Sequence, residues 1–278
     1  MTTLRLGIST CPNDTFAFHG LLTGAVTVPG VRLDFELLDV QELNEGLARG
    51  RFDAAKGSYF AAIGLADRLY ALRAGSAVGR GVGPVLLGRR GADPAAPSPR
   101  VLGPGPATTA HLLLRSFRPE LAPVESVVFS EIMPRLARGE ADFGACIHEG
   151  RFTYREAGLE LVEDLGATWE RRFDRPLPLG GIFARADLEF GLAVALEDGI
   201  RRSLDLARSD PDATRPTMRR WAQELDDAVI QAHVDLYVDD RTRELDDDAL
   251  EAVGHMSGLA RAAGLIPAAT PELRFPTA

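Results

Sequence analysis

The chain has 278 residues, of which 45% are hydrophobic and 26% charged, and its formal net charge at pH 7 is -9. This hydrophobic fraction suffices for the core of one large domain or two ordinary ones. The acidic balance argues against nucleic acid or an anionic membrane as partner, because both reward clusters of Lys and Arg. We therefore expect a small-molecule partner.

The N-terminal residues and the cysteines bear on location. Residues 1–10 pass from polar residues into a strand-like run, without the basic, apolar and cleavage segments of a secretory signal. No apolar stretch approaches the roughly 20 residues that span a bilayer. The only cysteines, Cys11 and Cys146, are too few for a disulfide scaffold or a cysteine-built zinc site. These features predict a soluble, cytoplasmic protein with no metal site.

The first third of the chain alternates between strand and helix patterns. Apolar residues at 4–9 predict a strand, and 14–24 predict a helix with Asp14 and Thr15 as caps and Gly24 at its end. A strand at 31–39, an amphipathic helix at 40–50 and a strand at 52–59 follow. This order, βαβαβ, indicates a parallel or mixed sheet covered by helices.

A second series repeats the first in kind and order. Residues 70–90 predict one or two strands broken by glycine, and the Pro-, Ala- and Gly-rich residues 91–100 predict a crossover. The next five elements are then expected in the order strand, helix, strand, helix, strand, at 100–105, 108–117, 124–130, 131–140 and 142–149.

One short segment also matches letter by letter between the two series. Residues 47–50 (LARG) and Asp53 align with residues 136–139 (LARG) and Asp142, which places Ser58 opposite Ile147 and Tyr59 opposite His148. Such a match also arises from a common helix ending. Together with the shared order of elements, it favours two related α/β lobes.

The last third changes to helical patterns, after a strand at 177–187 that crosses back to the first lobe. Helices are expected at 188–209, 214–238 and 246–266, and without strands of their own they must cover the apolar faces of an existing sheet. We therefore predict a discontinuous first lobe of residues 1–91 plus 183–278, with the C-terminal helices packed on it, and a second lobe of residues 92–182. Two lobes joined by two crossovers form a cleft.

Four stretches are expected at this cleft. Ligands of open α/β sheets bind beyond the carboxyl ends of strands and beside helix N-termini, where N–H groups and the helix dipole meet an anionic or polar group. Residues 9–15, 56–60, 103–110 and 146–150 follow strands in this way. In the third, the hydroxyls and amides of Thr108 and Thr109 suit a carboxylate, although Thr108 also suits a simple N-cap.

His148 is the strongest candidate for acid–base chemistry. Imidazole titrates near neutral pH and can take up and return a proton, and His148 follows an apolar run at the expected cleft. A histidine satisfied by a loop carbonyl is the alternative. The other histidines, His19, His111, His233 and His255, fall within helices and have no carboxylate or cysteine partners at metal-ligand spacing.

Four stretches resemble the 1,4-dihydroxy-6-naphthoate synthase family, the lyases that act on cyclic dehypoxanthinyl futalosine in the futalosine route to menaquinone. They are residues 9–24 (STCPNDTFAFHGLLTG), 56–64 (KGSYFAAIG), 104–115 (PGPATTAHLLLR) and 147–154 (IHEGRFTY). CPNDTF and IHEG are the most specific parts. The order and spacing agree over essentially the whole chain, including residues 232–238 (AHVDLYV).

This resemblance implies a fold like the type II periplasmic binding proteins, which is α/β with two lobes and a deep central cleft. It implies that His148 is the general base and that no cofactor is needed. It also implies that the substrate, a small molecule with a carboxylate, is bound by Ser58, Thr108, Thr109, Ala110 and the backbone around Ile147, and further by Asn13, Asp14, Pro178 and Gly180.

Three alternatives share the expected fold. A chorismate dehydratase of the same route also binds a carboxylated small molecule, but we would not expect an IHEG histidine in its pocket. A non-catalytic solute-binding protein would carry a signal peptide and a lipid-attachment cysteine. The effector half of a transcription regulator would carry a helix-turn-helix before its first lobe, whereas here a strand begins at Leu4.

Overall fold

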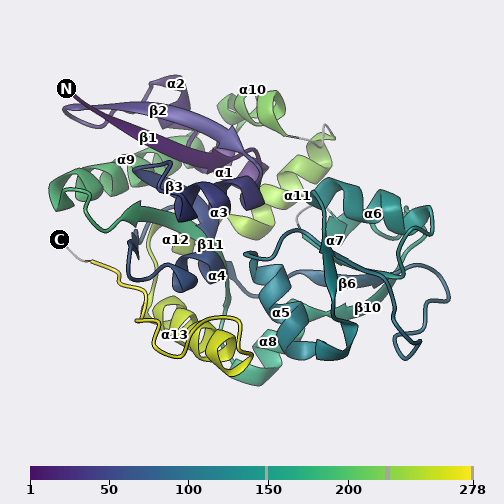
Figure 1. The fold of residues 1–278 in the computed structure, drawn as a ribbon. Coiled ribbons are helices and arrows are strands. Elements are labelled where there is room, and N and C mark those ends of the chain that lie inside the picture. The colour runs from purple at the N-terminus through teal and green to yellow at the C-terminus, as the bar shows by residue number, and fades with distance from the viewer. Residues whose placement is uncertain (148–149, 223–225, 277–278) are drawn as a thin grey trace.

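The computed structural model describes residues 1–147, 150–222 and 226–276, and its strands form two sheets (Figure 1). The first sheet has the order β2-β1-β3-β11-β4, and β5 also pairs with β11. Its strands are β1 (Thr2–Ser9), β2 (Val31–Leu38), β3 (Ala54–Ser58), β4 (Leu69–Ala71), β5 (Ala77–Gly79) and β11 (Leu177–Arg185). The second sheet has the order β10-β6-β9-β7-β8. Its strands are β6 (Val85–Gly88), β7 (Val101–Gly103), β8 (Val124–Ser126), β9 (Phe143–Cys146) and β10 (Glu160–Asp164).

The helices fall into three groups along the chain. Those of the first lobe are α1 (Pro12–Ala17), α2 (His19–Thr23), α3 (Val40–Ala48) and α4 (Tyr59–Gly64). Those of the second lobe are α5 (Thr109–Phe117), a 3-10 turn (Pro119–Leu121), α6 (Phe129–Ala137), α7 (Gly150–Thr153) and α8 (Leu165–Phe173). The C-terminal group comprises α9 (Phe190–Ser209), α10 (Pro211–Trp221), α11 (Asp227–Tyr237), α12 (Asp240–Arg243) and α13 (Asp247–Ala262). The predicted two-lobed α/β fold is confirmed.

The repeat predicted from the sequence is visible in the topology. In each lobe the first strand of the repeat lies between the other two, in the orders β2-β1-β3 and β8-β7-β9, and all these pairs are parallel. Helices α3 and α6 are followed by Gly50 and Gly139, whose φ angles are 66° and 72°. The LARG segments therefore end equivalent helices.

Several elements differ from the sequence prediction. The helix expected at 14–24 begins earlier, at Pro12 with Cys11 as N-cap, and is interrupted at Phe18, so Asp14 and Thr15 are not caps. Asp14 lies buried inside α1 because its carboxylate pairs with a lysine that is distant in sequence. β10 and α8 were not predicted, because residues 150–176 carry no clear periodicity.

Sheet membership also qualifies the lobe ranges. Strand β6 lies within the range predicted for the first lobe, 1–91, yet it pairs with β9 and β10 in the second sheet. Strand β11 starts at Leu177, inside the range 92–182, yet it pairs with β3, β4 and β5 in the first sheet. Strand pairing places both crossovers several residues before the predicted boundaries at residues 91 and 182. The exact lobe boundaries stay a prediction.

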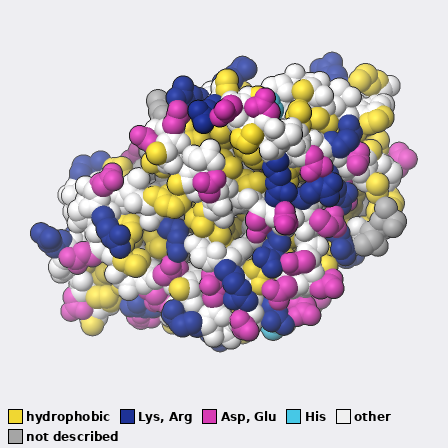
Figure 2. Space-filling view, turned by 180° about the vertical axis from the view of Figure 1, so that it is seen from behind, with side chains coloured by type: hydrophobic (Ala, Val, Ile, Leu, Met, Phe, Trp, Pro, Cys, Tyr) yellow, Lys and Arg dark blue, Asp and Glu magenta, His cyan; other side chains and the backbone are white. Residues whose placement is uncertain are grey.

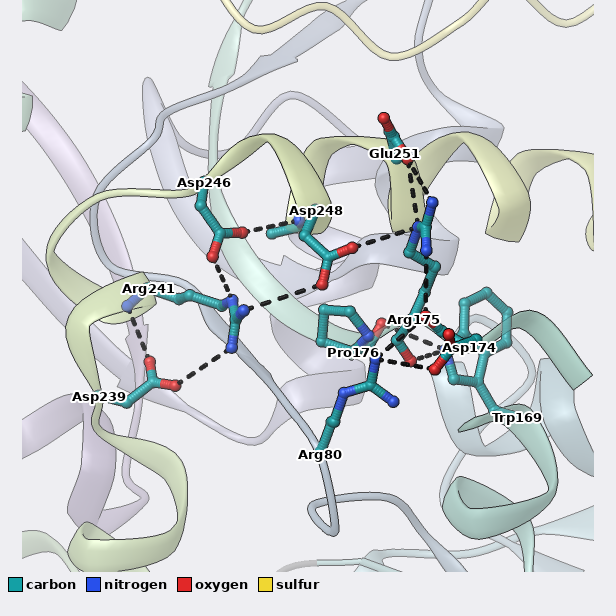
Figure 3. Close-up of polar contacts among 11 residues, drawn as sticks. Arg80, Trp169, Asp174, Arg175, Pro176, Asp239, Arg241, Asp246, Asp248 and Glu251 are labelled. Atoms are coloured by element: carbon teal, nitrogen blue, oxygen red, sulfur yellow. Dashed lines mark hydrogen bonds and ion pairs between the residues drawn. The ribbon is translucent and has the colours of Figure 1, made fainter. Parts of the chain in front are cut away.

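The C-terminal helices complete the first lobe and hold the crossovers. Helices α9, α10 and α11 pack on α1, and α13 packs on α4 and β11. Figure 3 shows the ion pairs of Arg175, in the segment between α8 and β11, with Asp248 and Glu251 of α13 at 3.2 and 2.7 Å. In the same view Arg80, which follows β5, contacts Asp174. The crossover before β11 is thus bound to α13, and the crossover after β5 is bound to the crossover before β11.

The surface carries charged side chains of both signs. On the face drawn in Figure 2, Asp and Glu side chains lie interspersed with Lys and Arg. Elsewhere in the described structure, Arg side chains form ion pairs with acidic residues, such as Arg89 with Asp142 and Arg243 with Asp205, both at 2.8 Å. Among the described residues, no helix is long and apolar enough to cross a membrane.

Candidate active site

A cavity of ≈ 680 Å³, open to solvent, lies between the lobes. Residues from β1, α1, β3, α5, β11 and α11 line it, and so do the segments that follow β5 and β9. Eight of the predicted site residues line it: Asn13, Asp14, Ser58, Thr108, Thr109, Ala110, Ile147 and Gly180.

The first-lobe side of the cavity holds a buried ion pair. Lys56 Nζ lies 2.6 Å from Asp14 Oδ1, and their side chains are only 8% and 3% exposed. Lys56 also donates to the Gly75 carbonyl at 3.0 Å, and Ser9 Oγ donates to Asp14 Oδ2 at 2.7 Å. A buried charge is tolerated when it is paired and hydrogen-bonded in this way. This part of the cavity is therefore polar without carrying a net charge from the pair.

Ser58 follows Lys56 on β3 and is held by Asn44 of α3. The Ser58 N–H donates to Asn44 Oδ1 at 2.8 Å, and Asn44 Nδ2 donates to Ser58 Oγ at 3.3 Å. The same Nδ2 lies 3.3 Å from the carbonyl oxygen of Ala107, in the turn before α5. Asn44 therefore links the two turns that carry the predicted substrate-binding residues.

The second-lobe side of the cavity is the N-terminus of α5. Thr108 is the N-cap, which the sequence left open as an alternative to carboxylate binding: its Oγ1 accepts from the His111 N–H at 3.2 Å and donates to the Gly105 carbonyl at 2.8 Å. Gly105 has φ 129°, and a Cβ there would lie 2.2 Å from Gln41 Oε1. Only glycine fits this turn. Thr109 Oγ1 donates to the Leu179 carbonyl of β11 at 3.0 Å, so it joins the lobes.

Since both threonine hydroxyls are engaged, the backbone carries the anion-binding capacity of this turn. Among the hydrogen bonds of the described residues, none uses the N–H groups of Thr109 or Ala110. These groups open a nine-residue helix, where unpaired N–H groups and the helix dipole favour an anion. Burial lowers the pKa of His111, and the nearby Arg115 lowers it further, so the ring on this turn is neutral at pH 7.

β11 contributes one of its two predicted residues to the cavity. Gly180 pairs with Ser58 in the sheet, and a Cβ at Gly180 would lie 2.9 Å from the Gly57 carbonyl oxygen and 3.2 Å from Lys56 Cε. A larger residue there would crowd the ion pair. Pro178 is buried in β11 opposite Val78 and is not among the residues that line the cavity.

The predicted base lies outside the described residues. β9 ends at Cys146, Ile147 lines the cavity, and His148 and Glu149 follow beyond the described part of this segment. Burial raises the pKa of the Cys146 thiol far above its usual range, so this residue stays protonated and is not a nucleophile. Over residues 1–147, 150–222 and 226–276, no three His, Cys, Asp or Glu side chains gather as metal ligands.

Sequence reasoning gave no role to four polar residues of this cavity: Ser9, Lys56, His233 and Tyr237. Ser9 and Lys56 belong to stretches that were expected at the cleft, whereas His233 and Tyr237 do not. A lysine inside a predicted buried strand was an available signal for Lys56, because such a charge requires a partner. For His233 the sequence offered no carboxylate or cysteine partner at metal-ligand spacing, and its Nε2 lies 3.0 Å from an amide oxygen, Asn13 Oδ1. A separation of 220 positions in the sequence leaves no local signal.

Comparison with known proteins identifies the family. The family model described as menaquinone biosynthesis matches residues 4–262. A curated 1,4-dihydroxy-6-naphthoate synthase from Thermus thermophilus is 46% identical over 95% of this chain and 96% of its own length. Its namesake from Streptomyces coelicolor is 40% identical over 99% of both chains.

Solved structures agree on the fold. Protein AF1704 from Archaeoglobus fulgidus superposes with a TM-score of 0.87 at 28% identity, over 95% of this chain and 98% of its own. The ligand-binding component of an ABC-type import system from Staphylococcus aureus has a TM-score of 0.73 at 14% identity, over 99% and 97% of the two chains. The fold is thus that of the periplasmic binding proteins, and the chain belongs to the menaquinone-biosynthesis enzyme family that includes the 1,4-dihydroxy-6-naphthoate synthases.

Proposed function

We propose that this protein is a carbon–carbon lyase that converts cyclic dehypoxanthinyl futalosine into 1,4-dihydroxy-6-naphthoate, with His148 as general base. The similarity to two curated synthases over 95% or more of the chain carries the proposal. The cavity supports it, because its lining includes eight of the residues that the family resemblance implies. From the two cysteines, which are too few for a disulfide scaffold, we further propose that the reaction takes place in the cytoplasm.

The substrate's carboxylate is assigned to the N-terminus of α5. The N–H groups of Thr109 and Ala110 point to an anion site there, whereas on the first-lobe side Asp14 already neutralises Lys56 and leaves no positive charge for a carboxylate. Hydroxyl and ether oxygens of the substrate fit the neutral Asp14–Lys56 pair. This orientation assigns one side of the cavity to the charge and the other to uncharged oxygens.

The chemistry needs one base and a dry, polar cavity. His148 starts the reaction by removing a proton from the substrate, and the electron pair that this releases drives the cleavage of a carbon–carbon bond. The carbon fragment on one side of that bond leaves as a second product. The bicyclic ring on the other side keeps the bonding electrons, takes a proton back and becomes aromatic. Aromatisation supplies the driving force. The remaining residues hold the substrate and stabilise developing charge on oxygen with N–H and O–H donors.

The first experiment incubates purified, metal-free protein with cyclic dehypoxanthinyl futalosine and follows the naphthoate by absorbance and mass. We expect product from the wild type and about 10² to 10⁴ times slower turnover for His148→Ala, which is the usual contribution of a positioned base. His255→Ala, on the exposed face of α13, is the matched control and keeps full activity. Tight binding without product from the wild type would point to a non-catalytic binding protein, and turnover of chorismate instead would point to the dehydratase.

A second experiment tests the carboxylate site. Thr109→Pro removes the first N–H of α5 at a position where proline fits a helix, because Thr108 already has the extended conformation that precedes proline. Thr109→Ala keeps this N–H and removes only the hydroxyl. We expect Thr109→Pro to raise KM about tenfold or more above that of Thr109→Ala, since hydrogen bonds to charged groups are worth about 1.5–3 kcal/mol. Equal KM values would place the carboxylate elsewhere.

A further inference from the structure

A fully buried histidine on the C-terminal part of the chain lines the cavity. His233 lies on α11, which packs against α1 and β5 and is seen beside α1 in Figure 1. Its side chain is 0% exposed, and its ring lies 4.6 Å from that of Tyr237, measured between centroids. The proposed reaction gives this imidazole no role, although it faces the same cavity as the predicted substrate-binding residues.

The imidazole is bonded to Asn13, and the partners of Asn13 fix the direction of this bond. Asn13 Nδ2 donates to Asp14 Oδ1 at 3.2 Å, so the Asn13 oxygen is the atom that faces His233. That oxygen only accepts hydrogen bonds, and His233 Nε2, 3.0 Å away, must therefore be the donor. Asparagine is required here because its side chain accepts from one neighbour and donates to the other.

Asp14 links this series of hydrogen bonds to the Asp14–Lys56 ion pair. Asp14 Oδ1 receives both the Asn13 amide and the Lys56 ammonium, at 3.2 and 2.6 Å, and Oδ2 receives the Ser9 hydroxyl. The series His233, Asn13, Asp14 and Lys56 thus runs from α11 through α1 to β3, and all four residues line the cavity. Each donor and acceptor in it restricts the rotation of the next side chain.

We propose that His233 is a positioning residue for ligand binding, which acts through Asn13 to fix the Asp14–Lys56 pair in the cavity. Without the Nε2–H donor, the Asn13 amide loses the partner that holds its oxygen, and the carboxylate loses a fixed donor in turn. The effect falls on binding rather than on the chemical step, because the proposed base follows β9 in the other lobe. This inference rests on the proposed function for its substrate.

The test compares two amide substitutions that differ in reach. In His233→Gln the side-chain NH₂ reaches the position of Nε2, whereas in His233→Asn it does not. We expect His233→Asn to raise KM for cyclic dehypoxanthinyl futalosine about tenfold with kcat changed less than about threefold, and His233→Gln to stay within about threefold of wild type in both. Equal KM values for the two variants would overturn the proposal.

A double-mutant cycle tests whether the effect passes through Asn13. If it does, His233→Asn changes KM by less than about twofold in an Asn13→Ala background, because the contact is already lost. A full tenfold effect in that background would show that His233 acts independently of Asn13. A wild type without activity on this substrate would instead contradict the proposed function, so the two failures are distinguishable.

A measurement on the unaltered protein guards against variants that do not fold. Nitrogen-15 labelled histidine in wild-type protein reports by NMR which ring nitrogen of each histidine carries a proton. The proposal requires a proton on Nε2 of His233, and we expect its resonance to shift in Asn13→Ala. An unprotonated Nε2 could not donate the hydrogen bond to Asn13, and this result would overturn the proposal whatever the substrate.

Discussion

The two lobes share one scaffold but hold different chemistry at its edge. In both, a nine-residue helix ends in a left-handed glycine, Gly50 or Gly139. An aspartate then receives a backbone N–H from the neighbouring parallel strand. Asp53 Oδ2 accepts from Arg5 at 2.7 Å, and Asp142 Oδ2 accepts from Arg100 at 2.9 Å. The repeat is therefore reproduced down to a single hydrogen bond.

Beyond these aspartates the lobes diverge. Lys56 and Ser58 on β3 correspond, at the same offset, to Ala145 and Ile147 in the second lobe. The first lobe presents polar side chains to the cavity, while the second presents the free N–H groups at the start of α5. The shared backbone of the two lobes therefore fixes where groups that can bind a ligand lie. The residues at the ends of the strands decide which chemical groups these are.

The largest expected effect comes from removing one charge of the first lobe. Lys56→Met leaves Asp14 buried without its cation, and we expect the free energy of unfolding to fall by about 3–5 kcal/mol. Chemical denaturation measures this loss. The double variant Asp14→Leu, Lys56→Met should recover most of the stability and still lack activity. A loss below about 1 kcal/mol for the single variant would mean that the pair is not a structural requirement of this lobe.

The paired aspartates give the next largest effect and sharpen the comparison directly. We expect Asp53→Asn to cost about 2 kcal/mol and Asp142→Asn about 1 kcal/mol in denaturation experiments. Asp53 is the more buried, at 13% against 28% side-chain exposure, and its carboxylate lies near both Arg5 and Arg185. The reverse order would show that burial does not decide the strength of this repeated contact.

The glycines should respond equally in the two lobes. At Gly50 and at Gly139 a Cβ would meet nothing within 4 Å, so only the left-handed backbone conformation penalises a side chain. Gly50→Ala and Gly139→Ala should each cost about 1 kcal/mol. Thermal unfolding of both variants beside wild type checks this. Costs that differ by more than about 1 kcal/mol would contradict the structural equivalence of the two helix ends.

The smallest effect is the pH dependence of Asp142. The backbone N–H of Arg100, followed by Arg89, lowers the pKa of this carboxyl below its usual value. Its stabilisation is therefore complete above about pH 4, where the unfolded carboxyl is ionised, and is lost as the pH falls through the lower folded pKa. The stability difference between wild type and Asp142→Asn should shrink below pH 4. A difference that stays constant from pH 7 to pH 3 would contradict this linkage.

The sequence by itself determined the features that depend on local pattern. Alternating strand and helix periods predicted both lobes and the C-terminal helices, and the strand-to-helix turn at 103–110 was expected at the cleft, where Thr108 and Thr109 line the cavity. These features are readable because side-chain periodicity and capping act over a few residues. The same reasoning failed at Asp14, where a distant cation outweighed the preference of aspartate for a cap.

Only the tertiary structure decided the contacts between distant segments. Strand β6 joins the second sheet because it pairs with β9, which its composition does not reveal. Lys56 meets Asp14 across 42 residues, and His233 meets Asn13 across 220. No local pattern encodes such pairs, because the packing of α1, β3 and α11 around one cavity brings their side chains together.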